Sequence, residues 1–252
     1  MNRIRAVISY DGTNFSGYQI QPNGRTVQEE IEKALVKIHK GLVVRVVASG
    51  RTDAKVHAKG QVVHFDSHLN IPNENWKRAL NALMPEDIYV KEAFLVDQQF
   101  HARFDVVEKE YRYIIHTAEK DIFLRNYVYA IHESLNIQAM SDACQYVVGE
   151  HDFTSFCAAN TNVKGDKIRT IYHATCTEVG DKVTFTFKGS GFLYNMVRIL
   201  VGTMIEVGRE KLSPQDMVNI IEAKDRKKAG KTAPPQGLYL WNVVYPNDKD
   251  SI

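Results

Sequence analysis

The residues best suited to chemistry lie in one short stretch, where a single carboxylate stands among basic side chains. Asp53 comes two residues after Arg51, and Lys55 and His57 follow it. Nearby positive charge favours the ionised form of a carboxylate, and the same cations can hold a polyanion beside it. An ionised carboxylate held next to phosphates indicates chemistry on a nucleic acid.

Apolar runs flank this stretch, residues 43–48 before it and residues 61–65 after it, and Gly50 marks a turn between them. The pattern predicts a strand, a tight loop that carries Asp53, and a second strand. By itself, an aspartate in such a loop is also compatible with a turn residue or with a member of a structural ion pair.

Several segments of the chain resemble, in the same order, those of the tRNA pseudouridine synthases of the TruA family. Gly50-Arg51-Thr52-Asp53-Ala54 resembles the family's signature loop. The chain departs from the family's usual pattern at Lys55, where Gly is usual, and at Tyr18, where Trp is usual. The other segments that carry the resemblance are residues 9–19, 26–28, 100–104, 109–113, 191–198 and 229–245.

The resemblance implies an isomerase that converts uridine to pseudouridine at positions 38, 39 and 40 in the anticodon arm of tRNA. Such a reaction breaks the glycosidic bond, turns the base and reattaches it through carbon, so it needs no metal and no cofactor. Asp53 is then the essential carboxylate, acting as a nucleophile or as a base. The family also implies a homodimer that binds one tRNA.

Arg198 is a candidate without any family knowledge, because it lies in an almost wholly apolar helical segment, residues 193–201. A partly buried charge needs a carboxylate or phosphate partner, unless the side chain extends to solvent. The resemblance implies that Arg198 pairs with Asp53.

Tyr111 is expected on a strand, on the same face as Tyr113 and opposite Arg112. Aromatic side chains on a strand either pack in the core or stack on unpaired bases. For Tyr113 we expect core packing. For Tyr111 the resemblance implies stacking on the target uracil, with the hydroxyl near the proton transfer.

Cations in the matching segments are candidates for RNA contacts. The loop of residues 224–231 is also strongly basic, and we expect it to be a mobile solvated loop or an RNA contact. The principal candidates are Arg51, Lys55, His57, Arg103 and Lys109, followed by Arg25, Lys59, Arg112, Lys164, Lys167 and Arg169.

The bulk composition is that of an ordinary globular protein, with a net charge of only +2. Cys144, Cys157 and Cys176 have the spacing of neither a disulfide framework nor a zinc site. His64 and His68 flank Asp66 at alternate positions, a pattern more typical of a solvent-facing strand than of a metal site. Without an apolar run of membrane-spanning length or a signal-like N-terminus, the sequence predicts a cytoplasmic protein.

The order of predicted elements indicates an α+β protein with two domains, residues 1–104 carrying the Asp53 loop and residues 105–252 carrying Tyr111 and Arg198. Each domain is expected to be ferredoxin-like (RRM-like), and the resemblance implies joined antiparallel sheets with a central cleft. Expected strands are 4–10, 43–48, 61–66, 88–96, 111–116, 168–176, 183–188 and 238–245, and expected helices begin near 27, 73, 136, 193 and 213.

Two alternatives accompany this interpretation. The chain could be a non-catalytic RNA-binding or RNA-chaperone protein, for which paired α+β halves are also suitable. Asp53 argues against that class, because a pure binder gains little from an acidic group beside an anionic ligand. Lys55 allows for a pseudouridine synthase paralogue with a different RNA site.

Overall fold

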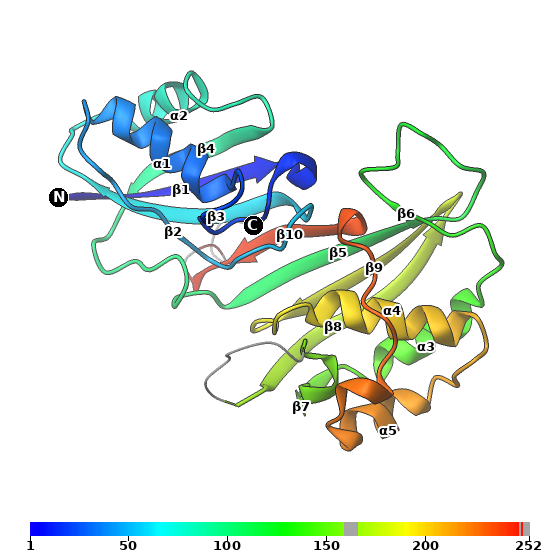
Figure 1. Ribbon diagram of the computed structural model, residues 1–252. Coiled ribbons are helices and arrows are strands. Elements are labelled where there is room, and N and C mark those ends of the chain that lie inside the picture. Colours follow the sequence, from blue (N-terminus) through cyan, green and yellow to red (C-terminus); the bar gives the residue numbers. More distant parts are fainter. Residues whose placement is uncertain (159–165, 247, 249–252) are drawn as a thin grey trace. The chain divides into compact units, whose positions relative to one another are not determined.

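A computed structural model describes residues 1–158, 166–246 and 248 (Figure 1). The chain forms two compact units. The first consists of Met1–Val107 together with the chain from Tyr239 onward, and the second is Glu108–Leu238. Both units combine helices and strands, which confirms the predicted α+β class. The predicted domains were residues 1–104 and 105–252, whereas here the first boundary lies between Val107 and Glu108 and the chain from Tyr239 onward belongs to the first unit.

The sheet of the first unit is built around β1, which pairs with antiparallel neighbours on both sides. The strand order is β4-β1-β3, with β2 antiparallel to β3 and the C-terminal β10 parallel to β3 at Tyr239↔His57 and Leu240↔Ala58. The strands are β1 (Asn2–Tyr10), β2 (Val47–Ala48), β3 (His57–Ser67), β4 (Ile88–Val96) and β10 (Leu238–Val244).

Two helices pack on this sheet, α1 (Val27–Ile38) and α2 (Asn73–Asn81) (Figure 1). Thr26 caps α1, since its hydroxyl accepts a hydrogen bond from the backbone N–H of Glu29. Trp76 of α2 is fully buried and meets Phe65 of β3 edge to face, with ring centroids 5.3 Å apart. Apolar burial of this kind is the main stabilising contribution to the unit.

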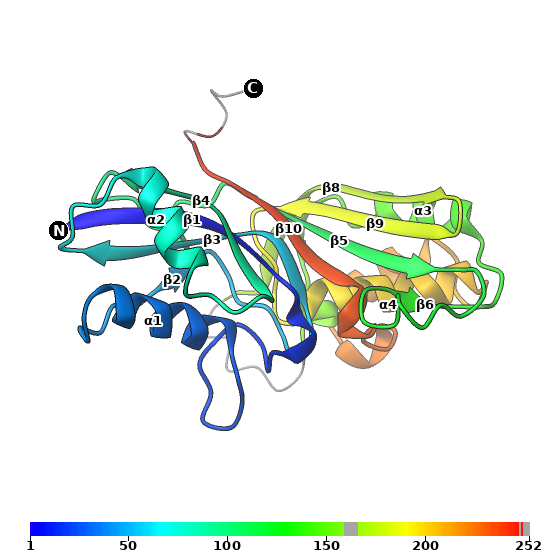
Figure 2. The same ribbon diagram turned by 90° about the horizontal axis from the view of Figure 1, so that it is seen from above.

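The second unit has the strand order β5-β9-β8-β7, antiparallel throughout, with the short β6 parallel to β5. Helices α3 and α4 contact one another beside these strands (Figure 2). The elements are β5 (Glu108–His116), β6 (Tyr129–Ala130), α3 (Ile137–Gln145), β7 (Gly149–Asp152), β8 (Ile168–Val179), β9 (Lys182–Gly189), α4 (Met196–Gly208) and α5 (Asp216–Ala223).

Local sequence patterns account for several details of the second unit. Val183, Phe185 and Phe187 alternate along β9 and are all buried on one of its faces. Asn136 caps α3 by accepting a hydrogen bond from the backbone N–H of Ala139. Every residue of α4 except Arg198 and Glu206 is buried.

The strands around the Asp53 loop differ from the prediction. Residues 43–48 were expected to form a strand, but β2 is only Val47–Ala48. The backbone N–H of Val46 instead donates to the Glu32 carboxylate of α1. Strand β3 begins at His57, four residues earlier than expected, because its start pairs with β10 from the far end of the chain. A local pattern does not reveal such long-range pairing.

Candidate active site

Asp53 lies in the loop between β2 and β3, with a half-buried side chain. A tight turn follows it, closed by the hydrogen bond from the Val56 N–H to the Asp53 carbonyl at 3.2 Å. Lys55 has a φ of 65°, the left-handed conformation that glycine adopts most easily. The loop therefore forms where the sequence predicted it, and its backbone is strained at Lys55.

Buried polar side chains fix the start of this loop. The Gln61 side chain accepts a hydrogen bond from the Ser49 hydroxyl at 2.6 Å and donates one to the Gly50 carbonyl at 2.9 Å. The hydroxyls of Thr52 and Tyr10 share a buried hydrogen bond of 2.8 Å. Burial raises the pKa of Tyr10 to about 12, so this hydroxyl keeps its proton at neutral pH.

The segment of residues 11–18, which contains the short 3-10 helix η1 (Gly12–Asn14), packs directly on the Asp53 loop. The backbone N–H of Tyr18 donates to the Thr52 carbonyl, and the N–H of Lys55 donates to the Phe15 carbonyl. A Cβ on Gly12 would lie 2.1 Å from the Val56 carbonyl oxygen, so only glycine allows this approach. Gly17, with a φ of 110°, faces Thr52 and Asp53 in the same way.

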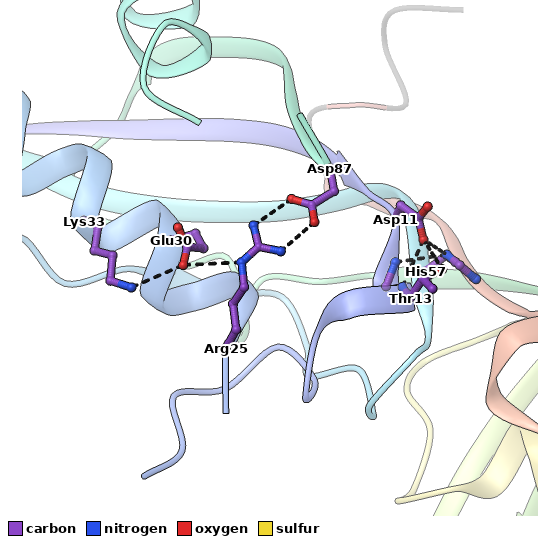
Figure 3. A network of polar contacts seen from close by, with 8 residues as sticks. Asp11, Thr13, Arg25, Glu30, Lys33, His57 and Asp87 are labelled. Carbon is purple, nitrogen blue, oxygen red and sulfur yellow. Dashed lines mark hydrogen bonds and ion pairs between the residues drawn. The ribbon is translucent and has the colours of Figure 1, made fainter. Parts of the chain in front are cut away.

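Arg25 holds the 11–18 segment against the rest of the unit (Figure 3). Its guanidinium makes two hydrogen bonds to the Asp87 carboxylate, at 2.6 and 2.9 Å, and lies 3.6 Å from Glu30. It also lies 4.3 Å from the centre of the Phe15 ring. These contacts brace the segment that in turn contacts the Asp53 loop.

His57 is only 2% exposed and its observed contacts are internal. Its Nδ1 accepts the N–H of Gly12 at 3.0 Å and lies 3.2 Å from the Asp11 carboxylate (Figure 3). Its ring stacks on Tyr239 at 4.8 Å. We therefore assign His57 a positioning role between the 11–18 segment and β3, while its predicted RNA contact stays a prediction.

In the second unit, Arg198 is half-buried and held by groups on both sides. Its Nε donates to the Ala233 carbonyl at 2.8 Å, and its Nη1 donates to the Asn195 side-chain oxygen at 2.9 Å. Asn195 has a φ of 60° at the start of α4. The Arg198 carbonyl also accepts the N–H of Ala233. The guanidinium is thus held in a fixed direction.

This arrangement depends on a close approach between α4 and residues 230–233. A Cβ on Gly202 would lie 1.7 Å from the Lys231 carbonyl oxygen. The Thr203 hydroxyl accepts the N–H of Gly230 at 2.9 Å. The basic loop 224–231 was expected to be either a mobile solvated loop or an RNA contact. Its last residues are packed on α4, because Gly202 and Gly230 leave no side chains between the two backbones.

Tyr111 and Tyr113 lie on the same face of β5, as predicted, and both side chains are buried. Tyr113 is fully buried and its hydroxyl donates to the Pro234 carbonyl, which confirms core packing. Tyr111 meets Phe192 edge to face at 5.2 Å. Since Ala233 contacts Arg198 and Pro234 contacts Tyr113, consecutive residues tie α4 to β5.

Asp53 belongs to the first unit, whereas Tyr111 and Arg198 belong to the second. Their predicted meeting stays a prediction. Among the predicted RNA contacts, Arg51, Lys55 and Arg103 are exposed and Lys109 is half-buried. Arg25 and Arg112 form ion pairs with Asp87 and Glu110, and Lys164 lies outside the described residues.

Sequence reasoning missed the residues that support the catalytic candidates. Gly12, Gly17 and Gly202 matter because a backbone passes within contact distance of each, and only the fold shows which backbone that is. Gln61 and Asn195 carried no distinctive local signal. Part of this support could have been suspected from the sequence, because Gly12, Gly17 and Asn195 all lie in segments that carry the family resemblance.

Across the described residues, no group of three or more His, Cys, Asp or Glu side chains is arranged to hold a metal ion. The carboxylate of Asp66 is bound to Arg3 by two hydrogen bonds of 2.8 Å, and His68 packs edge to face on His39. Within the same ranges, no helix has the length and apolar character needed to cross a membrane.

Comparison with known proteins gives matches along nearly the whole chain. The family described as tRNA pseudouridine synthase matches residues 6–105 and 143–246. The tRNA pseudouridine synthase A of Anoxybacillus flavithermus is 57% identical over 247 residues, 98% of this chain and 100% of that protein. Those of Bacillus subtilis and Oceanobacillus iheyensis are 55% and 49% identical, over 97% and 100% of this chain and 100% of each relative.

Among solved structures, a chain from the crystal structure of a Cbf5-Nop10-Gar1 complex matches 80% of this chain and 54% of its own length. The sequence identity is 16% and the TM-score 0.33, a likeness too weak to support an argument.

Proposed function

Since the chain belongs to the tRNA pseudouridine synthase family, we propose that it acts on the anticodon arm of tRNA, at positions 38, 39 and 40, through Asp53. The chain is an isomerase that converts uridine to pseudouridine in tRNA, as its full-length relatives indicate. The positions and the essential Asp53 are our inference from the resemblance of the signature loop.

The proposed reaction is an isomerisation in which the base stays the same apart from its point of attachment. The bond between N1 of uracil and C1′ of ribose breaks, and a bond between C5 and C1′ forms. The proton on C5 passes to water, and N1 ends with a proton. Asp53 either attacks the sugar or removes a sugar proton, and both roles require its ionised form.

The observation that carries this proposal is the way the fold presents Asp53. The loop is held by Gln61 and Tyr10 from its own unit and by the packing of Gly12 and Gly17. A catalytic group whose support is fixed loses little entropy when it engages substrate. We propose that Arg198 pairs with Asp53 and that Tyr111 stacks on the target uracil, in a cleft between two ferredoxin-like units with joined sheets.

The pairing pattern of the first unit supports the ferredoxin-like part of this proposal. Its strands follow the order β4-β1-β3-β2, all antiparallel, with α1 and α2 between strands as in a β-α-β-β-α-β unit. From the same family resemblance we propose that the protein works as a homodimer in the cytoplasm.

The experiment that tests the substrate is to map pseudouridine in unmodified tRNA before and after incubation with the purified protein. We expect new pseudouridine at positions 38–40 of tRNAs that carry uridine there. New pseudouridine confined to other positions would refute the anticodon-arm assignment and leave the reaction class intact. No new pseudouridine in any tRNA would refute the function.

A further inference from the structure

Phe104 is a feature of the first unit that the proposed chemistry leaves unexplained. Its side chain is 75% exposed, in the turn of residues 101–105 that follows β4. A single exposed aromatic residue is ordinary on a protein surface. What requires explanation is that the structure holds this exposed ring in a defined orientation.

His101 fixes the ring from one side. The imidazole stacks on the phenyl ring with 4.2 Å between centroids and 23° between planes. Its Nδ1 accepts the backbone N–H groups of Arg103 and Phe104, each at 3.2 Å. Ordering an exposed side chain costs conformational entropy. A ring that is ordered yet open to solvent is preorganised for a partner.

The turn itself is anchored in the core through Ala102, which is fully buried. The Ala102 N–H donates to Nδ1 of His64 at 3.1 Å, and the Ala102 carbonyl accepts the Tyr245 hydroxyl at 2.6 Å. The Asp105 carboxylate accepts the N–H of His101 at 2.7 Å. Rigid support on both sides of Phe104 makes the exposed ring a fixed part of the surface.

Arg103 indicates the chemistry of the partner. Its side chain is exposed, with the guanidinium carbon 5.8 Å from the centre of the Phe104 ring. Across the described residues no carboxylate lies within ion-pair distance of it. An open aromatic face beside an unneutralised cation suits an unpaired base with its phosphate, the combination found in proteins that bind single-stranded nucleic acid.

We propose that His101, Arg103 and Phe104 form a stacking platform for an unpaired base of the RNA substrate, with Arg103 contacting the adjoining phosphate. This inference rests on the proposed function, because it names a second point of contact with the same substrate.

The platform takes a nucleotide other than the target uridine. The turn of residues 101–105 contacts β3 at His64, whereas the Asp53 loop leads into β3 at His57. These two positions are seven residues apart on one strand, which corresponds to about 23 Å at roughly 3.3 Å per residue. On this ground we assign the base at Phe104 to a nucleotide other than the one at Asp53.

The test is equilibrium binding of unmodified tRNA at fixed salt by Phe104→Ala, Phe104→Trp and a control. Loss of one stacked base is expected to raise the Kd of Phe104→Ala roughly 5- to 150-fold. Phe104→Trp should bind within about twofold of wild type, and its added indole fluorescence should be quenched by bound RNA. An affinity of Phe104→Ala within twofold of wild type would overturn the platform.

The matched control is Phe123→Ala, because Phe123 is 78% exposed and is likewise a phenylalanine in a connecting segment, but it stacks on no aromatic ring among the described residues. It should leave the Kd unchanged. A single-stranded oligonucleotide should reproduce the Phe104→Ala defect, and a blunt RNA duplex should not. A changed oligomeric state with unchanged RNA affinity would identify Phe104 as a protein interface and refute the proposal.

Tritium release from C5-labelled uridine in the same preparations separates this inference from the proposed function. Release by wild type, with unchanged affinity in Phe104→Ala, would overturn only the platform. Loss of affinity in Phe104→Ala, with no release by wild type, would overturn only the proposed function.

Discussion

At the scale of single residues, Lys55 combines an exposed ammonium with a strained backbone, two residues after Asp53. A left-handed conformation costs a non-glycine residue about 1–2 kcal/mol. We predict that Lys55→Gly folds at least as stably as wild type but binds tRNA with a weaker salt dependence. Loss of one phosphate contact should reduce the slope of log K against log salt by about 0.7–0.9.

Lys40 provides the control, because it is also an exposed lysine with a positive φ, 53°. It follows the C-terminal end of α1, whereas the Asp53 loop packs near the N-terminal end of that helix through Gly17. Lys40→Gly should show a similar change in stability and no change in salt slope. Equal salt slopes for Lys55→Gly and wild type would remove Lys55 from the RNA interface.

Residue types indicated candidate reactive groups but not the residues that support them. Asp53 stood out because a carboxylate among cations is unusual, and Arg198 because a charge interrupts an apolar helix. The sequence predicted an RNA contact for His57, and that prediction stays open, but the sequence did not predict that His57 would be buried against Tyr239, a residue from the far end of the chain. His57 is buried because β3 pairs with β10, and the spacing of residues around His57 does not indicate that pairing.

At the scale of elements, α4 and residues 230–233 form one support for Arg198. Gly202→Ala places a methyl group against the Lys231 carbonyl, and overpacking of this kind typically costs about 1–3 kcal/mol. We predict that the displaced segment releases Arg198 from Ala233 and lowers kcat more than it raises KM for tRNA. Steady-state kinetics and denaturant unfolding measure these two effects.

Gly208→Ala in the same helix is the comparison. Its new methyl group would meet the end of the Met140 side chain and Leu135, which can move, so we expect kcat close to wild type. If both alanine variants lose turnover equally, general destabilisation of α4 explains the loss and the positioning of Arg198 does not.

Long elements with a clear hydrophobic period could be predicted from the sequence. The ends of the strands that flank the Asp53 loop could not. The stripe of α1 and the alternation of β9 followed from burial of one face. The shortness of β2 and the early start of β3 did not follow from such patterns. The backbone N–H of Val46 donates a hydrogen bond to the Glu32 carboxylate, and β10 pairs with β3 at His57. Tertiary hydrogen bonds decided both boundaries.

At the scale of the whole molecule, His64 makes the first unit sensitive to acid. The imidazole is 4% exposed, and burial, aided by Arg3 and His101, lowers its pKa from 6.5 to about 4. Between these values the unfolded chain binds a proton that the folded chain excludes. Stability is therefore full above about pH 6.5 and falls as the pH drops toward 4.

We predict that moving from pH 7 to pH 5 lowers the unfolding free energy of wild type by about 1–2 kcal/mol more than that of His64→Gln. Denaturant titrations at the two pH values give this difference and cancel any constant cost of the substitution. An identical fall for the two proteins would show that His64 does not carry the acid sensitivity.

Two compact units were expected from the order of elements, but the return of β10 to the first unit was not. Its sequence, residues 238–244, reads as a strand whichever unit it joins. Pairing with β3 places this strand in the first unit, and its partners on β3 lie about 180 residues earlier in the chain. Periodicity within a short window cannot reveal a partner at that separation.

The most direct test of the account compares Asp53→Asn with wild type for tRNA binding and for tritium release from C5-labelled uridine. The substitution keeps the shape of the side chain and removes its charge, so the surrounding loop should remain intact. We predict a tRNA Kd near that of wild type and no release above background. Release at the wild-type rate would contradict the assignment of Asp53 as the essential carboxylate.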